Sequence, residues 1–137
     1  MRKIILASHG EFSKGLLDSA KMIVGDLASC ATSYSLYPGE SAAQFALELE
    51  KVILEDKETE YVILSDLYGA SVCTAMLRLT TLPNVKLFSG MNLNMVLEIL
   101  TRFSDELSTE DIETLVEESR MGIQKVILQI NEEEEGF

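Results

Sequence analysis

Short, uninterrupted apolar runs that end in small polar residues constrain the fold of this chain more than any other feature. Such runs occupy residues 4–7 and 61–64. Two further segments have a similar length, one at 31–37 rich in Thr and Tyr and one at 85–88 in which Lys86 interrupts the apolar residues. A run of this kind is typical of a strand that is buried on both faces of a parallel sheet. We therefore expect four strands at these places.

Between the runs, apolar residues recur at the spacing of amphipathic helices. Helices are expected over about residues 16–24, 45–53, 69–81, 92–100 and 109–122, and a last strand over 125–130. Strands that alternate with helices predict an α/β fold, a doubly wound open sheet that is mostly parallel. In the strand order 2-1-3-4, ligands bind where the order reverses, between the carboxyl ends of the first and third strands.

The 137 residues fit one domain, which we expect over 1–130, followed by an acidic tail at 131–137. The chain has 23 acidic and 11 basic residues, a net charge of −12. Without a basic stripe, nucleic acid and an anionic membrane surface are disfavoured as partners. The two cysteines form no metal-ligand pattern, and no signal peptide or membrane span is evident. We expect a cytoplasmic protein without a cofactor or a metal.

The strongest candidate for chemistry is His9, the only histidine, which stands directly after the first strand. Asp66 follows the third strand in the same way, so the two side chains are predicted to lie side by side at the switch point. A carboxylate on one ring nitrogen fixes the imidazole tautomer and leaves the other nitrogen free to attack. The alternative is that Asp66 only caps the helix that follows.

Small residues beside these two side chains are candidate phosphate ligands. Gly69, Ala70 and Ser71 are predicted to start a helix, where free backbone N–H groups favour an anion, and Ser71 adds a hydroxyl. Gly10 lies in the turn next to His9. A plain turn of small residues is the alternative. Residues 10–15 match neither the dinucleotide-binding nor the P-loop pattern, so no nucleotide is expected.

Three sequence blocks stand in order at the expected strand ends. They are S-H-G at residues 8–10 with G-L at 15–16, D-L-Y-G-A-S at 66–71 and S-G-M-N-L at 89–93. Together they resemble the IIA domains of the mannose/fructose/sorbose family of the bacterial sugar phosphotransferase system. That family has S/T-H-G, D-L-x-G-G-[ST]-P and [ST]-G-x-N-L-P at these places. Ala70 replaces a family glycine, and Val72 and Asn94 replace family prolines.

The resemblance implies a phosphotransferase. It would accept a phosphoryl group on His9 from an HPr-like phosphocarrier protein and pass it to a IIB component, and so to a sugar entering through a membrane permease. In the family, the counterpart of Asp66 orients the histidine, and the counterpart of Ser71 contacts the phosphoryl group. The resemblance also implies a homodimer in which the C-terminal strand, here residues 125–130, is exchanged between subunits.

Other functions stay open from the sequence alone. A regulatory module that is phosphorylated but not coupled to transport would use the same surface, and an α/β domain without phosphoryl chemistry would explain the departures in the loops. A histidine phosphatase needs an arginine before the histidine and a second histidine. Ser8 occupies the first position, and the chain has no other histidine.

Overall fold

The computed structural model describes residues 1–128, in which strands and helices alternate. The α-helices and strands, with two 3-10 helices labelled η, are β1 (Arg2–His9), α1 (Phe12–Val24), η1 (Gly25–Cys30), β2 (Ala31–Leu36), α2 (Ala42–Leu54), β3 (Glu60–Ser65), α3 (Ser71–Met76), η2 (Leu77–Thr81), β4 (Val85–Phe88), α4 (Leu93–Thr101) and α5 (Thr109–Met121). Within this part of the chain, no helix has the length and apolar character needed to cross a membrane.

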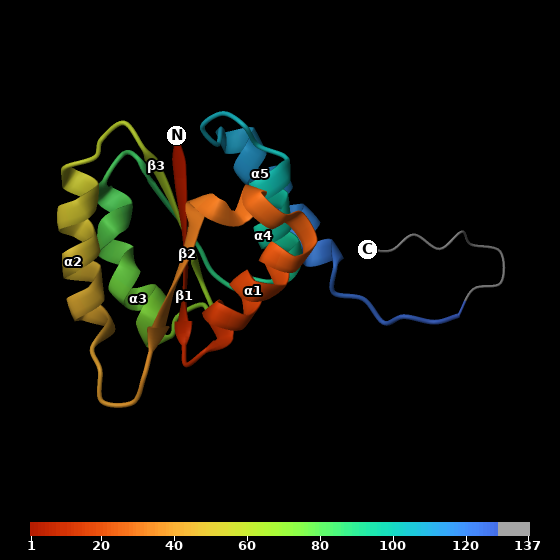
Figure 1. Cartoon of the computed structure of the whole chain (residues 1–137), viewed down its shortest axis with the longest axis horizontal. Coiled ribbons are helices and arrows are strands. Elements are labelled where there is room, and N and C mark those ends of the chain that lie inside the picture. The colour runs from red at the N-terminus through yellow and green to blue at the C-terminus, as the bar shows by residue number, and fades with distance from the viewer. Residues whose placement is uncertain (129–137) are drawn as a thin grey trace.

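The four strands form one parallel sheet in the order β2-β1-β3-β4. Helices α2 and α3 cover one face of the sheet, and α1, α4 and α5 cover the other (Figure 1). The predicted α/β fold, its doubly wound connections and its strand order are therefore confirmed. The order reverses between β1 and β3, so ligands are expected beyond the ends of these two strands.

Side chains of β1 alternate between the two halves of the core. Ile4 and Leu6 pack with α1 and α4, whereas Ile5 and Ala7 pack with α2 and α3. Because alternation continues to the end of a strand, Ser8 falls on the α1 side and His9 on the α3 side. The periodicity of a buried strand thus directs His9 towards the start of α3.

The prediction of one α-helix over residues 69–81 is wrong. Helix α3 has six residues, and the chain continues as the 3-10 helix η2. Two threonine hydroxyls in η2 bond to nearby carbonyl oxygens, Thr80 to that of Leu77 and Thr81 to that of Arg78. Such local bonds compete with the α-helical pattern, and β-branched side chains add to this tendency.

The strand expected at residues 125–130 does not form within the described part of the single chain. Residues 123–128 have no strand pairing and lead away from the body of the domain (Figure 1). Ile123, Val126 and Leu128 are exposed there. Residues 129–130 and the predicted acidic tail at 131–137 lie outside the described residues.

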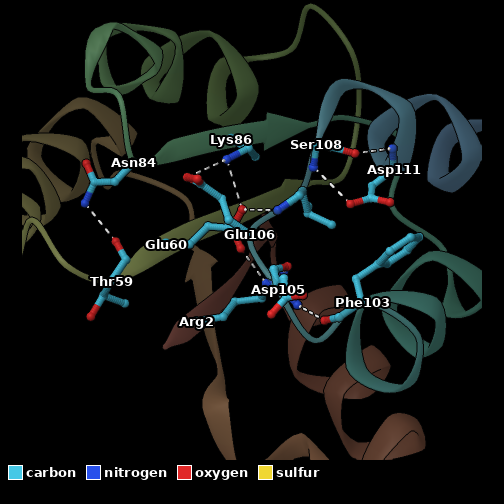
Figure 2. A network of polar contacts seen from close by, with 11 residues as sticks. Arg2, Thr59, Glu60, Asn84, Lys86, Phe103, Asp105, Glu106, Ser108 and Asp111 are labelled. Atoms are coloured by element: carbon cyan, nitrogen blue, oxygen red, sulfur yellow. Dashed lines mark hydrogen bonds and ion pairs between the residues drawn. The ribbon is translucent and has the colours of Figure 1, made fainter.

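At the amino end of the sheet, a buried carboxylate holds the loop between α4 and α5 (Figure 2). Glu60, which is 6% exposed, forms ion pairs with Arg2 at 2.7 Å and Lys86 at 2.9 Å. It also accepts the backbone N–H of Leu107 at 2.9 Å. Arg2 donates in addition to backbone carbonyls of the same loop. These contacts fix the entrance to α5 on the first residues of β1 and β3.

Burial and hydrogen bonding act in opposite directions on this carboxyl group. Burial raises the pKa of Glu60, but the bonds from the Leu107 N–H, Lys86 and Arg2 lower it further, so the net pKa lies below its ordinary value. Glu60 is therefore ionised at neutral pH, and its charge is balanced by two cations.

Candidate functional site

At the opposite edge of the sheet, the ends of β1 and β3 bring His9 and Asp66 together. The Nδ1 atom of His9 lies 2.8 Å from Oδ2 of Asp66. The backbone N–H of His9 donates to the same oxygen, also at 2.8 Å. One carboxylate oxygen thus holds both the main chain and the ring of the histidine, which fixes the direction of the imidazole.

The protonation of Asp66 determines the tautomer of the ring. Burial raises the pKa of this carboxyl group, which is 12% exposed, but the two hydrogen bonds and the charge of His9 lower it more. The net pKa lies below its ordinary value, so Asp66 is an ionised acceptor at neutral pH. The Nδ1 atom must then be the donor, and in the neutral ring Nε2 carries the free lone pair.

The third predicted catalytic residue, Ser71, lies on the other side of the ring. Its Oγ atom is 3.1 Å from Nε2 of His9, so its hydroxyl can donate to the lone pair. Ser71 is the first residue of α3, and a turn with Gly69 at φ +79° brings the chain back towards β1. The side chain of His9 is 50% exposed. His9, Asp66 and Ser71 therefore form one site in which Nε2 faces both a hydroxyl and the solvent.

The predicted phosphate ligands differ from expectation in the state of their amides. The N–H of Gly10 donates to the carbonyl of Leu36 at 2.7 Å, and the N–H of Ala70 donates to that of Leu67 at 3.2 Å. Neither amide is free for an anion in this state. The amide of Ser71, at the start of α3, has no intrahelical partner, because first-turn amides lack one. The donor that the structure places at Nε2 is therefore the Ser71 hydroxyl, at 3.1 Å. The third predicted phosphate ligand, Gly69, forms the turn that leads into Ser71.

The alternative function of Asp66 as a helix cap is wrong. The N-cap of α3 is Ala70, and α3 has no side-chain cap. The second oxygen of Asp66, Oδ1, accepts the N–H of Leu67 at 2.9 Å, within its own turn. Both oxygens therefore serve the loop and His9, and neither serves the helix.

Sequence reasoning missed a group of exposed apolar side chains close in sequence to the site residues, two of them in the loop after β3 and one at the start of α1. Tyr68 is 85% exposed and Leu67 is 62% exposed, directly after Asp66, and Phe12 is exposed three residues after His9. Their positions within three residues of His9 or Asp66 were the available signal. Exposed aromatic and apolar residues that surround a polar centre are typical of a surface that binds another protein.

The fold and the site together define an α/β protein in which a half-exposed histidine, held by a carboxylate, lies at the switch point of a parallel sheet. Known families agree with this class. The model of the family described as "PTS system fructose IIA component" matches residues 3–116. The PTS system sorbose-specific EIIA component of Klebsiella pneumoniae is 32% identical over 109 residues, which cover 79% of this chain and 78% of that protein.

Solved structures give the same result. The mannose/sorbose specific IIA subunit from Enterococcus faecalis has a TM-score of 0.80 at 26% identity, covering 93% of this chain and 96% of that one. The phosphotransferase system component EIIA from Streptococcus agalactiae has a TM-score of 0.78 at 27% identity, covering 91% and 97%.

The chain belongs to the fructose/mannose/sorbose family of IIA components of the sugar phosphotransferase system. Members of this family are phosphotransferases in sugar uptake that work with phosphocarrier and IIB components.

Proposed function

We propose that Nε2 of His9 accepts a phosphoryl group from the phosphohistidine of an HPr-like carrier protein and passes it to a IIB component for sugar uptake. The observation that carries this proposal is the contact between Asp66 and Nδ1. It commits one ring nitrogen to a carboxylate and leaves the other, half-exposed beside Ser71, as the nucleophile.

The transfer needs no cofactor, because the donor is already a reactive phosphohistidine. The lone pair of Nε2 forms a bond to phosphorus while the P–N bond of the donor breaks, and the electron pair of that bond stays on the donor imidazole. Asp66 stabilises the positive charge that develops on the His9 ring. After transfer, the Ser71 hydroxyl donates its hydrogen bond to a phosphoryl oxygen instead of Nε2. The same steps in reverse deliver the group to the IIB component.

The open surface around His9 suits a protein donor and a protein acceptor better than a small molecule. Phe12, Leu67 and Tyr68 supply exposed apolar area at the point where two protein active sites must meet. The net charge of −12 attracts basic partners and disfavours nucleic acid. The membrane permease is then reached only through the IIB component, and we propose a cytoplasmic location.

We further propose that residues 1–130 form the domain, that 131–137 form an acidic tail, and that the protein is a homodimer joined by exchange of residues 125–130. Two features of the described residues support a second copy as partner. Strand β4 is an edge strand of the sheet, with unpaired backbone groups along one side. A groove of about 470 Å³ runs beside it, lined by Phe88 and Val116 among others. The exposed apolar side chains of Val126, Ile127 and Leu128 match such a groove.

The proposal is tested by incubating the purified protein with phosphoenolpyruvate and the general carrier proteins. We expect one phosphate per chain that is labile in acid and stable in base, and its loss when a IIB component is added. The variant His9→Ala should fold normally and take up no phosphate. Labelling that persists in this variant would reject His9 as the acceptor. A phosphate that a IIB component does not remove would favour a regulatory module.

A further inference from the structure

The residue before the histidine has a function of its own. The geometry points to Ser8 as a positioning residue, whose buried hydroxyl fixes the turn that carries His9 and thereby sets the rate of phosphoryl transfer. This inference rests on the proposed function of His9. It concerns a residue that contacts neither Asp66 nor Ser71 through its side chain among the described residues.

The Ser8 hydroxyl joins two segments that flank the histidine. Ser8 is fully buried on the α1 side of the sheet. Its Oγ atom accepts the backbone N–H of Ser13 at 2.8 Å and lies 3.3 Å from the carbonyl oxygen of Gly10, to which it donates. The hydroxyl therefore donates its proton to Gly10 and accepts a hydrogen bond from Ser13, two residues that follow His9.

This contact replaces the cap that α1 lacks. The formal N-cap residue, Glu11, makes no side-chain hydrogen bond to the helix. The Ser13 amide in the first turn would be an orphan donor, and because Ser13 is fully buried, water cannot readily satisfy it. Ser8 supplies the missing acceptor from the strand. The start of α1 is thereby tied to the residue next to the nucleophile.

The turn at Gly10 is held on both sides as a result. Its N–H donates to the carbonyl of Leu36 in β2 at 2.7 Å, and its carbonyl accepts from Ser8. Gly10 has φ +55°, a left-handed conformation that relies on these contacts to keep one geometry. With the Gly10 turn fixed, the His9 ring is directed at Asp66. Without the Ser8 hydroxyl, the turn can rotate, and the ring moves relative to the incoming phosphorus.

The test compares Ser8→Ala and Ser8→Cys with Ser8→Thr. Alanine removes the hydroxyl, cysteine keeps the volume with a weak hydrogen-bonding group, and threonine keeps the hydroxyl. We expect kcat for phosphorylation to fall about tenfold or more in the first two, with KM for the carrier unchanged, because a small misplacement of a reacting group costs this much. Threonine should restore kcat to within about threefold of the original protein.

A matched control is Ser119→Ala, which removes another buried serine hydroxyl, bonded to the Leu115 carbonyl in α5. It should lower stability without changing kcat. If Ser8→Cys keeps the original kcat, or if Ser119→Ala loses as much activity as Ser8→Ala, the inference is overturned.

A second readout does not depend on phosphorylation. His9 is the only histidine, so ¹⁵N-labelled histidine gives one imidazole signal. In the unmodified protein it should report Nδ1 as a protonated nitrogen that donates to Asp66. Ser8→Ala and Ser8→Cys should mix the tautomers, whereas Ser8→Thr should not. Unchanged imidazole shifts in all variants would overturn the inference even if the protein proved not to be a phosphocarrier.

Discussion

The two ends of the sheet use the same kind of group in opposite ways. At the amino end, the Glu60 carboxylate is buried and ion-paired with Arg2 and Lys86 (Figure 2). At the carboxyl end, the Asp66 carboxylate bonds to a histidine whose side chain is 50% exposed. At the amino end, two cations and a backbone N–H bond to the Glu60 carboxylate, and these contacts stabilise the fold. The carboxyl end leaves Nε2 of His9 facing the Ser71 hydroxyl and the solvent, which is the arrangement that the proposed phosphoryl transfer needs.

The largest effect on stability is expected from a substitution of Glu60. In Glu60→Ala, Arg2 and Lys86 lose a buried partner, and removing one member of a buried ion pair costs about 3–5 kcal/mol. We expect a loss of this size in the free energy of unfolding in urea. Phosphorylation per folded molecule should be unchanged, because the site lies at the other end of the strands.

A matched control is available next to the same lysine. Glu106 lies 3.7 Å from Lys86 and is 68% exposed. Glu106→Ala should cost less than about 1 kcal/mol, as exposed pairs do. Equal losses of unfolding free energy in Glu60→Ala and Glu106→Ala would contradict the claim that the buried ion pair contributes more than the exposed one.

At the carboxyl end, Asp66→Asn should act on rate more than on stability. The amide oxygen can still accept from Nδ1, but the charge that stabilises the positive ring is lost. A hydrogen bond to a charged group contributes about 1.5–3 kcal/mol, which predicts a rate of phosphoryl transfer about 10- to 100-fold lower. Stopped-flow transfer from the phosphorylated carrier measures it. An unchanged rate would limit Asp66 to holding the loop.

A smaller effect is expected for Ser71→Ala. The hydroxyl contacts Nε2 at 3.1 Å, and a hydrogen bond between neutral groups contributes about 0.5–1.5 kcal/mol. The same rate measurement should therefore fall about 2- to 10-fold. Ser71→Thr, which keeps the hydroxyl, is the control, and a loss larger in Thr than in Ala would rule out a contribution from the hydroxyl.

The smallest effect is a shared dependence of stability on pH. Both carboxyl groups have pKa values below their ordinary values, 4.5 for Glu60 and 3.8 for Asp66. Above those ordinary values their contribution to stability is fully present. As the pH falls through the lower folded-state pKa values, the unfolded state binds more protons and the contribution is lost. Between about pH 6 and pH 3, a range that includes these ordinary pKa values, the original protein should lose unfolding free energy. Glu60→Gln and Asp66→Asn should each lose less than the original protein over the same range. The same loss in both variants and the original protein would contradict these directions.

The carboxyl end of the sheet could be predicted from the sequence. The apolar strands and the residues directly after them are local patterns, and parallel strand order converts them into a site. For this reason the sequence predicted that His9, Asp66 and Ser71 lie in one site. The sequence of the loops did not reveal which backbone amides are already hydrogen-bonded and so not free for an anion. The replacements at Ala70 and Val72 gave no signal of this either.

The amino-end network could not be predicted in the same way. Arg2 and Glu60 are 58 residues apart in the sequence. Nothing in the residues around either one distinguishes it from a charged residue on the solvent-exposed surface. Their burial depends on the path of the α4–α5 loop, which no local pattern specifies. The hydroxyl of Ser8 was missed for a related reason, because its partners are backbone groups. The strand at 125–130 needs an edge to pair with, and an edge on a second chain is not a local property.

The most direct test of the account is to identify the phosphorylated nitrogen. The protein, labelled with ¹⁵N-histidine, is phosphorylated by the carriers and studied by ³¹P and ¹⁵N NMR. Because Asp66 holds Nδ1 at 2.8 Å, we expect the phosphorus to be bonded to Nε2, with Nδ1 still protonated. A phosphate on Nδ1, or one on no histidine atom, would contradict the central claim.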